Sequence, residues 1–200
     1  MKGKDKLETY RGKRDFSRTP EPESGSEGAG GKPIFVIQQH AARRMHFDFR
    51  LEVDGVLASW AVPKGPSTDP RERRLAVRTE DHPLEYARFE GRIPEGEYGG
   101  GLVIVWDTGE YQNMSEEDGR RIPVKEALGA GHAKVRLLGR KIRGGYALIH
   151  TRMGGEEKNW LLVKEKDEEA DARRNPVATE PRSVLSGKTV EEMAESTDSD

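Results

Sequence analysis

The chain has 200 residues and no cysteine, which excludes disulfides and thiolate metal sites, so any metal must be held by histidine, carboxylate or water. Hydrophobic residues make up 33% and charged residues 35%, a polar composition that indicates one folded domain with unfolded ends. The formal net charge of −2 is unlike that of a uniformly basic nucleic-acid binder, and the longest strongly apolar run, at 102–106, is too short to span a bilayer.

The N-terminal part of the chain is basic and then rich in small residues. Residues 1–18 hold seven Lys and Arg against three Asp and Glu. Residues 17–33 are rich in Pro, Gly, Ser and Glu, a composition typical of linkers. We therefore predict a flexible basic arm and linker over residues 1–33, followed by a folded domain over residues 34–166.

The middle of the chain reads as a series of short strands. Residues 45–53 alternate strictly between apolar and polar side chains, which is the period of a half-buried strand. Asp54 and Gly55 follow, a pair typical of tight hairpin turns. Further strands are predicted at 35–38, 56–62, 74–79, 102–106, 132–138, 146–151 and 159–164, with a helical turn at 124–128 and glycine-rich turns at 99–101, 144–145 and 154–155. This spacing predicts an all-β domain, either a closed or nearly closed β-barrel or a sandwich.

The C-terminal part of the chain is acidic. Residues 164–200 hold eleven Asp and Glu against six Lys and Arg, so we predict that residues 167–200 form a largely disordered acidic tail. Within the tail, Thr189 is followed three positions later by Glu192, which is the pattern of a capping box. The tail is therefore expected to contain one short helix.

The sharpest motif is QQHAARRMHFDFRLEVDG at residues 38–55. His46, Asp48 and Arg50 occupy alternate positions, so a strand points all three side chains to the same face. His40 lies six residues before His46, close enough for the chain to fold back. Two imidazoles and one carboxylate form a ligand set that suits Mn²⁺, Fe²⁺ or Zn²⁺. The alternative interpretation is a strand whose polar face is simply solvated.

Several cationic residues suggest a phosphate near this motif. Arg50 beside a metal is suited to clamp two phosphate oxygens, although pairing with a carboxylate across the strand is a common alternative. Lys64 and Arg74 are further candidate phosphate contacts, or else ordinary surface charges. Because histidine side chains ordinarily change charge near neutral pH, His82 is our candidate for protonating a leaving oxygen or binding a phosphate oxygen, or else has a structural role.

Two other features point to structure rather than chemistry. The glycine run EGEYGGG at residues 95–101 lacks the pattern of a phosphate-binding loop and precedes a strand, so we interpret it as turn chemistry. Trp60, Trp106 and Trp160 fall within predicted strands and are expected in the core rather than on a base-stacking surface.

Long segments of the chain resemble one family, the phosphoesterase module of bacterial DNA ligase D, which also occurs as stand-alone proteins in bacteria and archaea. The resemblance covers most of the chain in ordered motifs. The resembling segments are FVIQQHAARRMHFDFRLEVDGVLASWAVPKGPS, RRLAVRTEDHPLEYARFEGRIPEGEYGGG, VIVWDTGEY, KNWLLVKEKD and SVLSGKTVEEM.

The resemblance implies a compact β-barrel with a polar groove and an Mn²⁺-dependent enzyme that acts at 3′ ends. The family removes a 3′-terminal ribonucleoside to leave a 3′-phosphate, and then removes the phosphate to leave a 3′-hydroxyl. The implied metal ligands are His40, His46 and Asp48. The implied phosphate-contacting and catalytic residues are Arg50, Lys64, Arg74, His82 and Tyr86. The implied substrate-binding residues are Gln38, which lines the same site, and Arg14, Asp15 and Glu21 of the arm segment KRDFSRTPEPE.

The partners implied are DNA 3′ ends that carry a ribonucleotide or a phosphate, and the ATP-dependent ligase and polymerase of end joining. We expect a cytoplasmic monomer with no membrane partner, because no secretory signal is visible and the lack of cysteine suits a reducing compartment. Two alternatives stay open. One is a non-catalytic module that docks DNA ends or a ligase; the other is a different β-barrel metalloenzyme, such as a cupin-like oxygenase.

Overall fold

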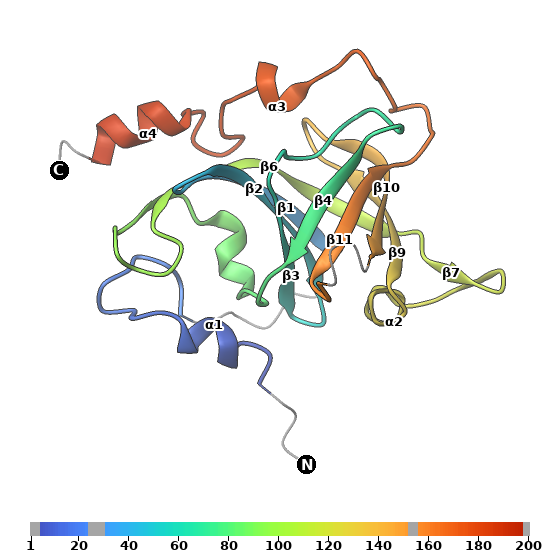
Figure 1. The fold of residues 1–200 in the computed structure, drawn as a ribbon, viewed down its shortest axis with the longest axis horizontal. Helices are drawn as coiled ribbons and strands as arrows, with labels where there is room; N and C mark the ends of the chain where they lie inside the picture. Colours follow the sequence, from blue (N-terminus) through green and yellow to red (C-terminus); the bar gives the residue numbers. More distant parts are fainter. Residues whose placement is uncertain (1–4, 24–30, 152–155, 198–200) are drawn as a thin grey trace.

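The protein is described here by a computed structural model covering residues 5–23, 31–151 and 156–197, and its centre is a closed antiparallel β-barrel (Figure 1). Within these residues, eight strands close the ring in the order β1-β2-β3-β4-β11-β10-β9-β6, because β6 pairs with β1 as well as with β9. The predicted all-β barrel is therefore confirmed, and the sandwich alternative is wrong. The ring strands are β1 (Ile34–Ala41), β2 (Met45–Val53), β3 (Val56–Val62), β4 (Arg73–Arg78), β6 (Gly101–Asn113), β9 (His132–Leu138), β10 (Arg143–His150) and β11 (Asn159–Lys164).

Short elements surround the barrel. A small hairpin projects away from it, and the last helix lies beyond the opposite side of the ring (Figure 1). The predicted turn at 154–155 lies outside the described residues, as do parts of the predicted arm, linker and tail. The surrounding elements are β5 (Gly91–Ile93), which pairs with β6, the hairpin of β7 (Glu116–Glu117) and β8 (Arg120–Arg121), the 3-10 helix η1 (Leu84–Arg88), and the helices α1 (Glu8–Gly12), α2 (Val124–Gly129), α3 (Pro176–Thr179) and α4 (Val190–Thr197).

The alternation along β2 separates the barrel core from the functional face. Phe47 and Phe49 point into the barrel and belong to its main apolar core. Since successive side chains on a strand point to opposite faces, His46, Asp48 and Arg50 point outward. The three tryptophans join the main core as predicted: Trp60, Trp106 and Trp160 are 0%, 0% and 8% exposed.

The arm packs against the outer face of the barrel, so the prediction of a flexible arm does not hold for residues 5–23. Tyr10 of α1 is fully buried in a second apolar cluster with Val36, Leu57 and Tyr86. The Tyr10 hydroxyl also donates a hydrogen bond to the carbonyl oxygen of Pro22 at 2.6 Å. Sequence composition missed this packing because the arm offers only a few apolar residues, and their partners lie far away in the chain.

The hairpin between β2 and β3 forms where it is predicted. Asp54 and Gly55 both have positive φ, 50° and 79°, as a two-residue turn of this kind requires. Glycine tolerates this backbone conformation without strain. The turn fixes the β2–β3 register, which places Asp48 beside Ala61 and Arg50 beside Ser59.

The described part of the tail, residues 167–197, packs against the barrel rather than remaining disordered as predicted. The predicted capping box is present: Glu192 N donates to Thr189 Oγ1 and Thr189 N donates to Glu192 Oε2, both at 3.2 Å. The helix α4 that it begins buries Val190 and Met193 against β6. No helix among the described residues is long and apolar enough to cross a membrane.

Candidate active site

Three potential metal ligands meet on the outer face of β1 and β2. His40 on β1 lies opposite His46 on β2, and Gln38 lies opposite Asp48, so the antiparallel register brings His40 and Asp48 to neighbouring positions on one face. One donor atom from each of His40, His46 and Asp48 lies within 4.8 Å of the other two. The chain therefore reverses direction between His40 and His46, as the sequence spacing predicts.

Backbone carbonyl groups orient both imidazole rings. His40 Nε2 lies 2.8 Å from the carbonyl oxygen of Gly99, and His46 Nδ1 lies 3.0 Å from that of Arg44. A carbonyl oxygen only accepts, so these two ring nitrogens carry the protons, and His40 Nδ1 and His46 Nε2 keep free lone pairs. Those two nitrogens face Asp48 Oδ2 at 3.4 Å and 3.7 Å. Metal-binding histidines are commonly oriented in this way.

The Asp48 carboxyl group is ionised although it is buried. Burial alone would raise its pKa. The charge of the Arg50 guanidinium, 3.4 Å away, opposes burial, and the pKa of Asp48 is held well below its usual range. The carboxylate is therefore available as an anionic ligand at neutral pH.

These donors fit a divalent transition metal. Two imidazole nitrogens with lone pairs directed at one carboxylate oxygen form a mixed nitrogen and oxygen set, which suits Mn²⁺, Fe²⁺ or Zn²⁺ better than Ca²⁺, which prefers oxygen ligands. His40 Nδ1, His46 Nε2 and Asp48 Oδ2 would hold the ion.

Arg50 is fixed beside the ligands by hydrogen bonds on two sides. Its Nε donates to Gln38 Oε1 at 2.8 Å, and its Nη1 donates to Ser59 Oγ at 2.9 Å. Its Nη2 lies 3.4 Å from Asp48 Oδ2. The predicted alternative, in which Arg50 pairs with a carboxylate on the strand, is thus present. The pairing also aims the guanidinium at the ligand set, where it can meet a phosphate oxygen.

Gln38 lies behind Arg50 and holds it in place. Its side chain is fully buried, and its Nε2 donates to the carbonyl oxygens of Tyr86 at 2.9 Å and Phe89 at 3.0 Å. With Oε1 accepting from Arg50, the whole amide group is engaged within the protein. The structure thus gives Gln38 a supporting contact to Arg50, and its implied place in the substrate site stays a prediction.

His82 lies between two guanidinium groups. Its Nε2 is 3.4 Å from Arg14 Nη2, and its Nδ1 is 3.0 Å from Arg50 Nη1 and 2.9 Å from the Glu80 carbonyl oxygen. Burial lowers the pKa of His82 to well below its usual value, and the charges of Arg50 and Arg14 lower it further. The ring is therefore neutral at neutral pH in the free protein.

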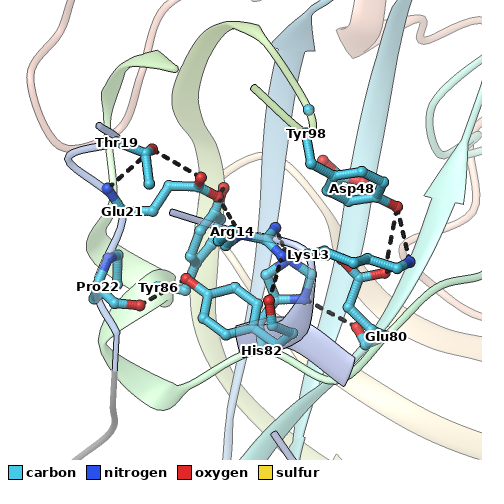
Figure 2. A network of polar contacts seen from close by, with 12 residues as sticks. Lys13, Arg14, Thr19, Glu21, Pro22, Asp48, Glu80, His82, Tyr86 and Tyr98 are labelled. Carbon is cyan, nitrogen blue, oxygen red and sulfur yellow. Dashed lines mark hydrogen bonds and ion pairs between the residues drawn. The ribbon is translucent and has the colours of Figure 1, made fainter. Parts of the chain in front are cut away.

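The arm completes the site through buried ion pairs. Arg14 Nε lies 2.9 Å from Glu21 Oε1, and Arg14 Nη1 lies 3.2 Å from Glu80 Oε1, with all three side chains at most 4% exposed. Tyr86 donates its hydroxyl hydrogen to Glu21 Oε1 at 3.0 Å. Burial raises the pKa of Tyr86 well above its usual value, and the Glu21 charge raises it further. Figure 2 shows Arg14 between Glu21 and Glu80, with His82 and Tyr86 beside it.

Three other predicted residues lie apart from this network. Asp15 is exposed, and its Oδ1 accepts hydrogen bonds from the backbone nitrogen and hydroxyl of Ser17. Arg74 lies on the same side of β4 as the core residue Ala76, and therefore faces away from the ligand set. Lys64 is exposed just after β3, near the end of β2 that carries His46, and makes no ion pair with a described residue.

Several residues that hold the site together were not predicted from the sequence. Gly99 belongs to the run interpreted only as a turn, yet its carbonyl oxygen fixes His40. Lys13 Nζ lies 3.0 Å from Glu80 Oε2 and 3.1 Å from the Tyr98 hydroxyl, which joins the arm to the same run. Glu80 lies two residues before His82 in the segment TEDHPLEY, and this proximity to His82 is the sequence feature that could have identified Glu80.

A groove opens beside the three candidate metal ligands. It lies between the turn that joins β1 to β2, strand β5 and the loop that precedes β6, and His46 forms part of its wall. Its lining also includes Arg43, Arg44, Arg92 and Tyr98. The ligand set is thus reached from a groove whose walls carry several cations.

The chain is similar to known proteins of DNA end joining. It is 46% identical over 188 residues to the multifunctional non-homologous end joining protein LigD of Pseudomonas aeruginosa, covering 92% of this chain and 22% of that protein. It is 48% identical over 170 residues to the protein of that name from Mycolicibacterium smegmatis, covering 82% of this chain and 21% of the relative. The chain thus spans about a fifth of the length of the curated relatives it matches.

The match to a family is equally extensive. Residues 38–150, more than half of the chain, match the DNA Ligase D 3′-phosphoesterase domain. This range includes all three candidate metal ligands and also Arg50 and His82. The chain therefore belongs to the family of DNA ligase D 3′-phosphoesterase domains.

Proposed function

We propose that the protein is an Mn²⁺-dependent phosphoesterase that processes 3′ ends in DNA repair by non-homologous end joining. It removes 3′-terminal ribonucleosides and then 3′-phosphates, leaving a 3′-hydroxyl. The observation that carries the proposal is the convergence of His40 Nδ1, His46 Nε2 and Asp48 Oδ2 beside the buried guanidinium of Arg50. The family membership and the names of the relatives support the same activity.

Each residue of the site has a part in this proposal. A divalent cation held by the three ligands would polarise a phosphoryl oxygen and make a water molecule more acidic. Arg50 binds the phosphate and offsets the negative charge that develops on its oxygens, since its geometry is fixed in advance by Gln38 and Ser59. Preorganisation of this kind avoids the cost of reorienting the guanidinium during the reaction.

His82 remains our candidate for the general acid. A protonated His82 is disfavoured in the free protein because the ring is buried and because Arg50 and Arg14 flank it. A bound phosphate would bring negative charge to this group and favour the protonated ring. His82 would then donate its proton to the leaving oxygen, and in both steps it remains a hydrogen-bonding partner for the phosphate.

The arm is proposed to serve the ribonucleoside step. Arg14 contacts His82 and the buried carboxylates of Glu21 and Glu80. Among the described contacts it makes none with the three candidate metal ligands, so we propose that it acts through His82. A terminal ribonucleoside differs from a deoxynucleoside by its 2′-hydroxyl, which the enzyme must accommodate or use.

The DNA end is the proposed partner, with the ligase and polymerase of end joining, and we propose a cytoplasmic monomer.

The test is a primer-template whose 5′-labelled primer ends in one ribonucleotide, incubated with the protein and Mn²⁺. The account predicts a band shortened by one nucleoside and ending in a 3′-phosphate, followed by a band without the phosphate. EDTA should abolish both products. A primer that stays intact while remaining bound would instead favour a non-catalytic docking module, and oxygen consumption with Fe²⁺ would favour an oxygenase.

A further inference from the structure

The groove beside His46 has an unusual distribution of charge. Arg43 and Arg44, in the turn between β1 and β2, are exposed, and neither side chain makes a hydrogen bond or ion pair with any residue that the structure describes. The lining also contains two carboxylates, but one of them, Glu97, lies 3.0 Å from Arg18 Nε. The groove therefore carries two guanidinium groups at the edge of the site that form no ion pair with a described carboxylate.

The turn is tied directly to the metal ligands. The carbonyl oxygen of Arg44 accepts the hydrogen bond from His46 Nδ1 at 3.0 Å. Arg44 therefore cannot move far without turning the His46 ring. Arg43 and Arg44 thus line the groove directly beside the ligand set, within reach of a chain whose end is bound there.

The opposite wall offers an exposed aromatic ring. Tyr98 is 46% exposed although it is a large side chain, and the Lys13 ammonium lies 4.5 Å from its ring centre. Sites for single-stranded nucleic acid share two features. Cationic side chains lie along the path of the nucleic-acid backbone, and an exposed aromatic ring stacks on a base. A groove for a small anion would need no exposed ring.

We propose that Arg43 and Arg44 bind backbone phosphates of the nucleic-acid strand just upstream of its 3′-terminal group. The contact is electrostatic and independent of base sequence, because it is made to phosphates. It contributes to holding the strand and not to the chemical step. This inference rests on the proposed function, since it places the strand end at the ligand set.

Direct binding tests the inference without turnover. The probe is a 5′-fluorescein-labelled single-stranded DNA 12-mer with a 3′-phosphate, and its anisotropy is followed in EDTA at several salt concentrations. The double variant R43Q/R44Q should bind roughly tenfold more weakly at low salt, and its plot of log affinity against log salt should be shallower by about 1.4, the value for two lost single-strand phosphate contacts. The matched control R73Q/R120Q removes the same charge from two exposed arginines outside the groove lining, and it should bind like the wild type.

The outcomes separate this inference from the proposed function. Wild-type affinity and salt dependence in R43Q/R44Q, equal losses in the control, or no binding by the wild type would overturn the inference. If the wild type binds through these arginines but releases no phosphate with Mn²⁺, the groove assignment stands and the proposed activity fails. Equal thermal unfolding midpoints for the wild type and both variants establish that binding, and not folding, has changed.

Discussion

Single hydrogen bonds determine the chemistry available at the ligand set. The Gly99 and Arg44 carbonyl oxygens select one tautomer of His40 and one of His46, and so decide which nitrogen of each ring is free. Both carbonyls come from backbone that has no chemical function of its own. An imidazole without such a partner could rotate or bind a proton on the wrong nitrogen, and would be a weaker ligand.

The first prediction concerns Gln38, which holds Arg50. The variant Gln38→Ala removes the Gln38 partner of buried Arg50 Nε and of the Phe89 carbonyl oxygen, while the Tyr86 carbonyl oxygen keeps its hydrogen bond from the Phe89 backbone N–H. The free energy of unfolding should fall by about 1–3 kcal/mol, the cost of an unsatisfied buried polar group. Phosphate release should slow because the guanidinium is no longer oriented. Urea unfolding and initial rates measure the two effects.

The neighbouring residue provides the control for this variant. Gln39 lies on the opposite face of β1, and its buried Oε1 accepts no hydrogen bond from a residue that the structure describes. Gln39→Ala should therefore leave stability and rate nearly unchanged. A Gln38→Ala protein as stable and as active as Gln39→Ala would show that Arg50 needs no such support.

The second prediction concerns Arg14. Arg14→Ala removes the contact to His82 and the charge that pairs with Glu21 and Glu80, while the three metal ligands stay in place. Removal of a terminal ribonucleoside should slow by about tenfold or more, the cost of one charge-assisted hydrogen bond, and release of a 3′-phosphate should slow much less. Arg11→Ala in the neighbouring helix α1, where Arg11 pairs with the exposed Asp5, is the control. Equal slowing of both steps would argue against a substrate-end role for the arm.

At the scale of elements, the junction of β1 and β6 supports the site. Gly101, the first residue of β6, has a φ of +143°, and a Cβ added there would lie 2.3 Å from the Ala41 carbonyl oxygen. Ala41 follows His40 directly. The glycine run thus lets two backbones approach closely next to a ligand, a role that its composition alone does not reveal.

The third prediction follows from this close approach. Gly101→Ala should push β6 away from β1, lower the free energy of unfolding by about 1–3 kcal/mol through backbone strain, and weaken Mn²⁺ binding by displacing His40. Gly129→Ala at the end of α2, where an added Cβ meets nothing within 4 Å, should leave the metal affinity unchanged. Calorimetric titration with Mn²⁺ measures the difference. Equal affinities in the two variants would show that the junction does not support the ligands.

Local patterns predicted some elements well and others poorly. The bounds predicted for β2, β3, β9 and β11 match the structure, because alternation or a turn marks both ends of these strands. β6 continues to Asn113, beyond its predicted end at 106, because its polar second half pairs with β1 and β9. No pattern within that segment carries this information, since pairing depends on strands that are distant in the sequence.

At the scale of the whole molecule, the folded unit is larger than the predicted domain of residues 34–166. Arm and tail both pack on the barrel, and the arm contributes Arg14 and Glu21 to the site. The convergence of His40, His46 and Asp48 could be predicted because strand spacing places His46 and Asp48 on one face and His40 lies only six residues before His46. The Arg14–His82 contact could not, because 68 positions separate the two residues and only the folded arm brings them together.

The fourth prediction is that the junction of tail and barrel is sensitive to acid. Burial alone would raise the pKa of Asp167, but the Lys164 ammonium and the backbone N–H of Gly145 outweigh burial and lower it. A carboxyl group whose pKa is lowered by folding stabilises the native state above its ordinary pKa, and this stability is lost as the pH falls through the lowered value. The urea concentration at the unfolding midpoint of the wild type should therefore decrease as the pH is lowered below about 4.

The variant Asp167→Asn isolates this contribution. It cannot ionise, so it should be less stable than the wild type at pH 7, and the difference should shrink as the pH falls below about 4. A difference that stays constant from pH 7 to pH 3 would mean that the charge of Asp167 does not contribute to stability.

The central claim, that His40, His46 and Asp48 share one divalent ion, is tested most directly by counting bound Mn²⁺. The electron paramagnetic resonance signal of free Mn²⁺ is followed as the protein is added, for the wild type, Asp48→Asn, His40→Gln and the control Asp81→Asn, whose carboxylate pairs with Arg78 outside the ligand set. The account predicts one ion per chain in the wild type and the control, and at least about tenfold weaker binding in both ligand variants, with loss of both phosphoesterase steps. One ion bound with unchanged affinity in Asp48→Asn and His40→Gln would contradict it.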